Sequence, residues 1–264
     1  MLPRRTSFST YVIALKAAAC RVDDVRVPSG KSIYNVRMPT VELHSHTYIS
    51  DDCLMRPADI VRTCAARGID RLAVTDHNSI AGALEMQALA PTLVIVGEEV
   101  MTSQGELLAY FLRECVPAGL SPLETIGRLR EQGAAISVSH PFDRLRHGAW
   151  QAADLTAIID LVDAIEVFNS RCIYPEDNAR ALAFAREHAT LGTVGSDAHS
   201  HRELGRAVLK MARAGSPAEL IAGFASGERV TRLSSPAIHF TSRWAKLRKR
   251  LARRAGQPGS QTKP

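Results

Sequence analysis

Two histidines near the start of the first strongly apolar run are spaced so that they could bind a metal ion. Residues 41–47 read Val-Glu-Leu-His-Ser-His-Thr, which places His44 and His46 two positions apart. In a β-strand, successive side chains point to opposite faces, so these two imidazoles would point the same way. Such a pair suits a borderline transition metal. Taken alone, it is equally consistent with two ordinary polar residues at the end of a strand.

Further acids, histidines and amides follow this run and accompany six later apolar runs, nearly always at the C-terminal end. They are Asp51, Asp52, Asp76, His77, Glu98, Glu99, Glu106, His140, Asn169, Asp197 and His199. Any one of them could simply cap a following helix, as we would expect of Asp51, Asp52 or Asp76. Gathered at one end of a sheet, they would crowd unpaired charge unless cations neutralised it.

The chemistry of these side chains predicts a centre with two or three divalent metal ions. Imidazole and carboxylate ligands without a thiolate suit manganese, zinc or iron rather than calcium or magnesium alone. The number of candidate ligands exceeds what one tetrahedral ion needs, which favours bridging carboxylates.

The elements that must position these side chains alternate between short apolar runs and amphipathic stretches. The runs are 41–46, 71–75, 93–96, 107–112, 134–138, 164–168 and 192–194, and the clearest helices are 57–67, 121–132, 175–188 and 216–226. This alternation predicts an α/β fold with a closed or nearly closed barrel of about seven strands. Barrel enzymes build their active sites at the C-terminal ends of the strands. The join 101–106 is too short for a crossover helix, so its two strands should be antiparallel.

Length and composition predict one barrel domain with two extensions. The chain has 264 residues, of which 45% are hydrophobic and 23% charged, enough for a full α/β domain. We expect an N-terminal extension at 1–39, the barrel at 40–235, and a basic helix with a disordered tail at 236–264. In that helix Trp244, Leu247 and Leu251 form a stripe that should pack on the domain. Contact with nucleic-acid phosphates or anionic lipid is the alternative.

Charge and cysteine usage exclude several classes of protein. The net charge of +6 is concentrated at 243–254 and at Arg4-Arg5, so the body carries no general coat for nucleic acid. Five cysteines without CxxC spacing argue against a disulfide framework and favour a cytoplasmic location. No apolar run approaches the roughly 20 residues of a membrane span.

The polar motifs resemble, in order and spacing, those of the PHP superfamily, the polymerase-and-histidinol-phosphatase metal-dependent phosphoesterases. The resemblance covers about 41–206 and is carried by 44–47 (HSHT), 50–51 (SD), 75–77 (TDH), 97–99 (GEE), 140–141 (HP) and 195–199 (GSDAH). It implies a distorted (β/α)7 TIM-like barrel of the PHP type that holds up to three metals.

The resemblance also implies which residues bind each metal. The first metal would be held by His44, His46, Glu99 and Asp197, the second by Glu99, His140 and Glu106, and the third by Asp51, His77 and His199. Many members carry a histidine where this chain has Glu106. Asp52 replaces a glycine that often follows the Ser-Asp pair, so either aspartate could be the ligand.

Other polar residues near the strand ends are candidates for catalysis or substrate binding. Asp76 should orient a ligand or a water, which makes it a catalytic candidate. Asn169 and Arg171 follow the sixth run and should contact substrate. Arg171, Arg144, His201 and Arg202 are candidate phosphate clamps or proton donors, because arginine binds phosphate with two parallel hydrogen bonds.

These observations predict a phosphoesterase that acts on a small phosphomonoester or on the terminal phosphate of a nucleotide. A hydroxide bridging two metals would be the nucleophile. Three alternatives stay open: a 5′–3′ exonuclease that holds short RNA or DNA through the basic tail, a non-catalytic metal-binding regulatory module, and an amidohydrolase-type C–N hydrolase. The last of these usually needs a lysine at a strand end, and the sequence places none there.

Overall fold

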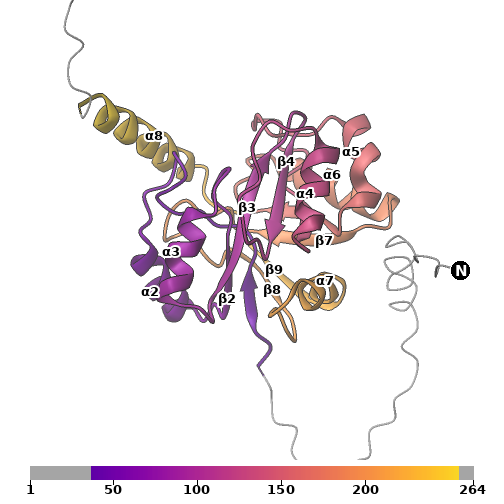
Figure 1. Ribbon diagram of the computed structural model, residues 1–264, viewed down its shortest axis with the longest axis horizontal. Helices are drawn as coiled ribbons and strands as arrows, with labels where there is room; N and C mark the ends of the chain where they lie inside the picture. The colour runs from indigo at the N-terminus through magenta and orange to yellow at the C-terminus, as the bar shows by residue number, and fades with distance from the viewer. Residues whose placement is uncertain (1–36, 256–264) are drawn as a thin grey trace, which may run out of the picture. The chain divides into compact units, whose positions relative to one another are not determined.

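A nine-stranded mixed sheet organises residues 37–255, the part of the chain that the computed structural model describes (Figure 1). A compact unit begins at Met38. Most of the expected N-terminal extension (1–39) and the expected disordered tail (256–264) therefore lie outside the described residues.

The sheet is parallel except around β4 and β8. Its strands are β1 (Thr40–Glu42), β2 (Arg71–Val74), β3 (Val94–Met101), β4 (Glu106–Tyr110), β5 (Ala135–Val138), β6 (Ala164–Asn169), β7 (Leu191–Gly195), β8 (Ala207–Lys210) and β9 (Glu228–Thr231). They are ordered β7-β6-β5-β4-β3-β2-β1-β8-β9. β3 and β4 pair antiparallel, as the short join between them predicts, and β4 also pairs antiparallel with β5. The expected seven runs all form strands, β1 to β7. Two further strands extend the sheet: β8 pairs with β1, and β9 pairs with β8.

The first seven strands curve into a nearly closed barrel. Ser45, just after β1, forms a parallel bridge with Ala198, just after β7, and His46 N–H donates to the Ala198 carbonyl at 3.0 Å. Gly195 permits this close approach, because a Cβ there would lie 2.6 Å from the Cβ of His44. The predicted distorted α/β barrel is confirmed.

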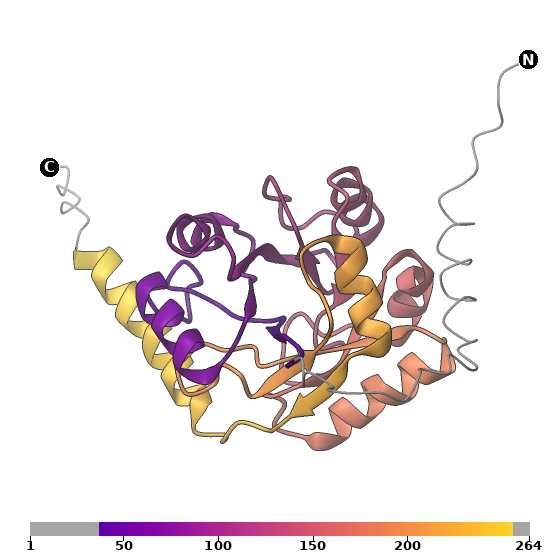
Figure 2. The same cartoon turned by 90° about the horizontal axis from the view of Figure 1, so that it is seen from below.

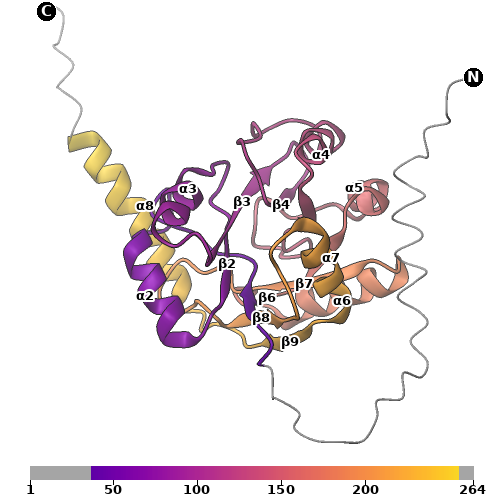
Figure 3. The ribbon, with the colours of Figure 1, turned by 60° about the horizontal axis from the view of Figure 1, so that its bottom comes forward.

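Helices lie outside the ring of strands (Figures 2 and 3). They are α2 (Pro57–Arg67), α3 (Ala81–Leu89), α4 (Pro122–Glu131), α5 (Ala152–Ile158), the 3-10 turn η1 (Ile159–Leu161), α6 (Pro175–Glu187), α7 (Pro217–Ser226) and α8 (Ile238–Ala255). The start of α4 shows why the sequence marks it: Ser121 accepts from Glu124 N–H, and the Glu124 side chain accepts from Ser121 N–H. This capping box satisfies backbone donors that the helix leaves free.

The barrel core consists mainly of aliphatic side chains, with a few aromatic ones such as Tyr110 and Phe224, and every residue of β4 and β5 is buried. Strands covered on both faces read as continuous apolar runs, which is why the sequence reveals them. Polar side chains are also buried, and many of them lie just past the strand ends, as His44, His46 and Asp197 do. The fold therefore concentrates the polar groups at one end of the barrel. No helix among residues 37–255 is long and apolar enough to cross a membrane.

Helix α8 forms as predicted, but the prediction about its apolar stripe is wrong. Trp244, Leu247 and Leu251 are 59%, 48% and 54% exposed, whereas Ser242 and Ala245 are buried. The helix thus turns its apolar stripe away from the barrel. Its basic face is held against the barrel instead, by contacts that span some 200 residues of sequence: Lys246 pairs with Asp52, Lys249 with the carbonyls of Tyr48 and Ser50, and Arg253 with Asp51.

Candidate metal centre

Eight of the nine predicted metal ligands converge at the C-terminal ends of the barrel strands. They form four overlapping groups, in each of which the potential ligand atoms lie within 4.8 Å of one another: His46-His77-His199, His44-His46-Glu99, His44-His140-Asp197 and His77-Glu99-Glu106. The groups share members, so the structure brings together one continuous cluster rather than separate sites.

Glu99 lies at the middle of this cluster and is fully buried. Its Oε1 lies 3.0 Å from His140 Nε2 and 3.3 Å from His44 Nε2, and its Oε2 lies 2.9 Å from His77 Nδ1. Oε2 is also 3.5 Å from His46 Nε2. Four imidazoles around the two oxygens of one carboxylate form a set of ligand atoms that could hold more than one metal ion.

Asp197 closes the cluster on the side of β7. Its Oδ1 lies 3.2 Å from His46 Nε2, 3.3 Å from His199 Nδ1 and 3.7 Å from His44 Nε2. Its backbone has a φ of +52°, a left-handed conformation that is uncommon for residues other than glycine. Such backbone is often found at functional sites, and here it accompanies the turn that brings Asp197 to the cluster.

Asp52, rather than the predicted Asp51, reaches the cluster. Asp52 is 8% exposed, and its Oδ1 lies 3.1 Å from His199 Nε2 and 3.7 Å from His77 Nε2. The Asp51 side chain is 61% exposed and pairs with Arg253 of α8 at 2.6 Å. The prediction of Asp51 as a ligand therefore needs correction. The tight turns of the connection after β1 send these neighbouring side chains in different directions.

Buried polar atoms in the cluster are consistent with bound cations. His44 Nε2, His46 Nε2, His199 Nε2, Glu99 Oε2, Asp197 Oδ1 and Asp52 Oδ1 are buried and have no hydrogen-bond partner among the described residues. A buried polar atom without a partner costs about 1–3 kcal/mol, and a metal ion would remove that cost for each of them. The mixture of imidazole and carboxylate ligands fits transition metals such as zinc, manganese or iron.

The second ring nitrogen of several ligand histidines is fixed by a neighbouring acceptor or hydroxyl. His44 Nδ1 lies 3.0 Å from Glu166 Oε1, His46 Nδ1 3.1 Å from Ser50 Oγ, and His199 Nδ1 2.8 Å from the Asp197 carbonyl. Such contacts set the tautomer and the orientation of a ligand histidine. The sequence interpretation missed Glu166, although an acid inside the buried strand β6 is a signal in itself.

Asp76 does not reach the cluster but holds the connection that carries its ligands. It accepts from Thr47 N–H at 2.7 Å and from the hydroxyls of Thr47 and Ser50, both at 2.6 Å. Ser50 in turn contacts His46 and accepts from the backbone N–H of His77. Asp76 therefore holds the residues that carry the ligands, and its position does not support direct proton transfer to substrate.

The electrostatics of the cluster hold Glu99, His46 and His199 in metal-binding protonation states, whereas the pKa values of His44, His77 and His140 lie above their usual value because carboxylates, Glu99 among them, outweigh burial. Burial and the neighbouring His77 lower the pKa of His46 to about 4, and burial lowers the pKa of His199 to about 4. Burial raises the pKa of Glu99, but His44 and His77 outweigh it and hold the pKa well below its usual value. Burial also lowers the pKa of His44, but neighbouring carboxylates, led by Glu99, raise it overall. The ionised Glu99 and the neutral His46 and His199 are the forms that bind metals.

Comparison with known proteins agrees with this geometry. Residues 42–124 match the family model for the PHP domain, and residues 175–228 match the PHP-associated model. An uncharacterized protein of Methanocaldococcus jannaschii is 35% identical over 174 residues, which cover 64% of this chain and 69% of that protein. The chain belongs to the PHP family.

Solved structures share the PHP fold at low sequence identity. A two-domain protein from Bacteroides vulgatus that contains a predicted PHP-like metal-dependent phosphoesterase superposes with a TM-score of 0.59 at 18% identity, covering 80% of this chain and 69% of that chain. A lesion-specific endonuclease from Pyrococcus furiosus superposes with a TM-score of 0.50 at 16% identity, covering 73% and 57%. Identities this low establish the fold alone.

In this PHP barrel, three residues predicted to bind phosphate or donate protons make their contacts outside the metal cluster: Arg144, His201 and Arg202. Arg144 is bound to Asp177 through two nitrogens, at 2.7 and 3.0 Å. His201 contacts Thr63 at 3.2 Å. Arg202 is exposed, and its backbone carbonyl accepts from the guanidinium groups of Arg67 and Arg206. None of these three side chains contacts the cluster as the structure describes it.

Asn169 and Arg171 are close to the metal centre but are buried in supporting contacts. The Asn169 amide donates to Glu166 at 3.0 Å and to Asp197 at 3.3 Å. Arg171 is 4% exposed and donates to Ser242 of α8 at 2.7 Å. Both side chains therefore brace the site, and neither is placed to bind substrate directly.

Arg146, which the sequence interpretation missed, pairs with the cluster. Its guanidinium contacts Asp197 Oδ2 and lies 3.4 Å from Asp143, and the side chain is 19% exposed. The sequence gives little reason to prefer Arg146, because it lies in the same loop after β5 as Arg144, the predicted phosphate clamp, and only two residues beyond it. It is the arginine that the structure places beside a metal ligand and within partial reach of solvent.

Proposed function

We propose that this PHP protein hydrolyses a small phosphomonoester or the terminal phosphate of a nucleotide, with two or three divalent metal ions. The observation that carries the proposal is the arrangement of four imidazoles around the buried carboxylate of Glu99. A structural salt-bridge network would need hydrogen-bond partners for the buried atoms that lack them, and metal ions suit those atoms better.

The ligands divide into regions that would hold separate ions. His44, His46, Asp197 and Glu99 lie together, and Glu99 also faces His140 and Glu106. Asp52 lies between His77 and His199. Bound ions would draw charge from the phosphoryl oxygens and supply an ionised water at neutral pH. Manganese, zinc and iron are the candidates that this ligand set favours.

The remaining residues of the site orient these ligands and supply positive charge. Glu166 and Ser50 fix the rings of His44 and His46. Arg146 brings a planar, permanently charged guanidinium to the edge of the cluster, where it can bind a phosphoryl oxygen through parallel hydrogen bonds. None of these roles requires a serine or cysteine nucleophile.

A nuclease is the second candidate, supported by the basic helix α8 at the entrance to the centre. Release of inorganic phosphate from a mononucleotide and release of nucleotides from an oligonucleotide distinguish the two activities directly.

The test is a panel of phosphomonoesters, nucleotides and short oligonucleotides, assayed with the full chain loaded with manganese, zinc or iron. We expect phosphate release from one or more small esters, and its loss in Asp197→Asn. Preferential cleavage of oligonucleotides would favour the nuclease. A flat panel with the metals fully bound would favour a regulatory metal-binding module.

A further inference from the structure

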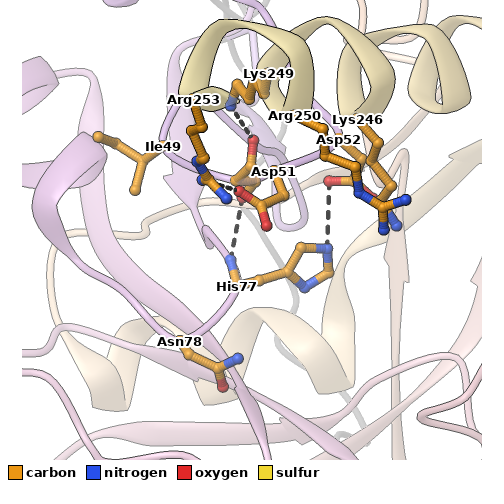
Figure 4. Close-up of a pocket in the computed structure, with 10 residues that line it drawn as sticks. Ile49, Asp51, Asp52, His77, Asn78, Lys246, Lys249, Arg250 and Arg253 are labelled. Carbon is orange, nitrogen blue, oxygen red and sulfur yellow. Dashed lines mark hydrogen bonds and ion pairs between the residues drawn. The ribbon is translucent and has the colours of Figure 1, made fainter. Parts of the chain in front are cut away.

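A cavity of about 410 Å³ lies between the metal centre and helix α8. Figure 4 shows basic side chains of α8 on one side of it and the aspartates of the connection after β1, with His77, on the other. Asp52 and His77 line the cavity and also belong to the metal cluster. The cavity is therefore continuous with the place where a phosphoryl group would bind.

The cavity carries an excess of positive charge. Lys246, Lys249, Arg250 and Arg253 line it, whereas its acidic lining residues are Asp51 and Asp52. With four basic side chains and two carboxylates, the lining of the cavity has a net charge of +2. Arg250 makes no ion pair among the described residues, and α8 itself contains no acid from Ile238 to Ala255. These charges favour an anionic ligand.

Contacts on the barrel side hold the basic face of α8 in this position. The Ser242 hydroxyl accepts from the buried guanidinium of Arg171 at 2.7 Å, and His239 Nε2 lies 3.2 Å from the Arg171 carbonyl. Lys249 Nζ donates to the carbonyls of Tyr48 and Ser50. The first turns of the helix are thus fixed beside the metal centre, so the basic groups are preorganised rather than carried on a free tail.

We propose that this cavity binds a second phosphate group of the substrate while the scissile phosphate lies at the metal centre. The inference rests on the proposed phosphoesterase function and narrows its substrate to small molecules with two phosphate groups. A single phosphate would already be met by the metal ions and Arg146, which leaves Arg250 and the excess positive charge of the cavity unused. The cavity has the size of a small-molecule site, which favours a compact ligand over a nucleic-acid strand.

Binding of non-hydrolysable probes tests the proposal without relying on turnover. Isothermal titration calorimetry on the manganese-loaded full chain compares propane-1,3-bisphosphonate with propylphosphonate. The variants are Arg250→Glu, at the cavity, and Arg248→Glu, an exposed residue of the same helix that does not line it. Both variants make the same change of charge in α8, so Arg248→Glu controls for the general field of the helix.

We expect the wild type to bind the bisphosphonate at least about tenfold more tightly than the monophosphonate, the scale of one or two hydrogen bonds to charged groups. Arg250→Glu should lose that preference, while Arg248→Glu should keep it within about twofold. Equal binding of the two probes by the wild type, or equal losses in the two variants, would overturn the proposal. So would tighter binding of oligothymidylate that both variants weaken alike, since that result indicates a nucleic-acid track along α8.

A parallel assay separates this proposal from the proposed function. If the chain binds the bisphosphonate as expected but releases phosphate neither from propane-1,3-diol bisphosphate nor from any ester of the panel, the phosphoesterase function fails and the anion site stands. If it hydrolyses both esters with the same kcat/KM and Arg250→Glu changes neither, the phosphoesterase stands and the second-phosphate site fails.

Discussion

Asp51 and Asp52 are adjacent in sequence, yet the structure predicts that only the change of Asp52 to asparagine affects metal binding. The Asp51 carboxylate is 61% exposed and pairs with a side chain that is itself 66% exposed. An exposed ion pair of this kind contributes about 0–1 kcal/mol. Asp51→Asn should therefore leave metal content and stability nearly unchanged.

Asp52→Asn should weaken metal binding, because Asp52 lies 3.1 Å from His199 Nε2 and 3.7 Å from His77 Nε2. Loss of a residue that only orients a ligand typically lowers metal affinity about 10–100-fold. Loss of a direct ligand should lower metal affinity by at least this factor, which corresponds to about 1.4–2.7 kcal/mol of binding free energy.

The assay is metal stoichiometry by mass spectrometry after dialysis against a series of buffered metal concentrations, with circular dichroism as a check on folding. We expect the wild type and Asp51→Asn to give the same binding curve, and Asp52→Asn to lose one ion or to require at least tenfold more free metal. The reverse pattern, with Asp51→Asn defective and Asp52→Asn normal, would refute the assignment.

Three further predictions follow from the surroundings of the centre. Burial raises the pKa of Glu42 to about 7, so the contribution of this group to stability is full below pH 4.5 and is lost as the pH rises through 7. In urea unfolding, the free energy of unfolding should fall between pH 5 and pH 8, and Glu42→Gln should reduce that fall by up to about 3 kcal/mol. A variant with the same fall as the wild type would contradict this. A Cβ on Gly148 would lie 2.1 Å from Glu106 Oε2, so Gly148→Ala should displace that carboxylate and lower phosphate release at least about tenfold. The control is Gly127→Ala, whose Cβ would meet nothing within 4 Å and which should leave phosphate release unchanged. Equal activities of the two variants would exclude Glu106 from the site. Removal of metal with a chelator should lower the Tm by several degrees, because ions that bind the folded state stabilise it, and a Tm that does not respond to chelator or to added manganese would argue against a metal centre.

The sequence predicts the barrel well because its signals are local. Apolar runs are bounded by turns, and the capping box at Ser121 lies within one helical turn. The histidines 44 and 46 share a direction because the backbone alternates around Ser45, even though the regular strand ends at Glu42 and only a bridge at Ser45 continues it. Local periodicity is sufficient for these features.

The errors concern side chains whose direction depends on distant partners. The choice between Asp51 and Asp52, and between Arg144 and Arg146, depends on Asp177, Asp197 and the helix α8. The orientation of α8 is a further case: its period predicts an apolar stripe and a basic face, but partners in the connection after β1 decide which of them faces the barrel. Spacing within the helix cannot report those partners.

The most direct test of the metal-centred phosphoesterase compares two neighbouring buried glutamates. Glu99 lies among four imidazoles, whereas Glu98 points to the other face and accepts from Val116 N–H at 2.9 Å and from the Cys115 thiol at 3.0 Å. Metal content and phosphate release are measured on the same preparations of Glu99→Gln and Glu98→Gln, with the best ester of the panel. We predict that Glu99→Gln loses bound metal and at least about 100-fold in phosphate release, while folded Glu98→Gln retains both. A Glu99→Gln protein that keeps its metal and its activity would contradict the account.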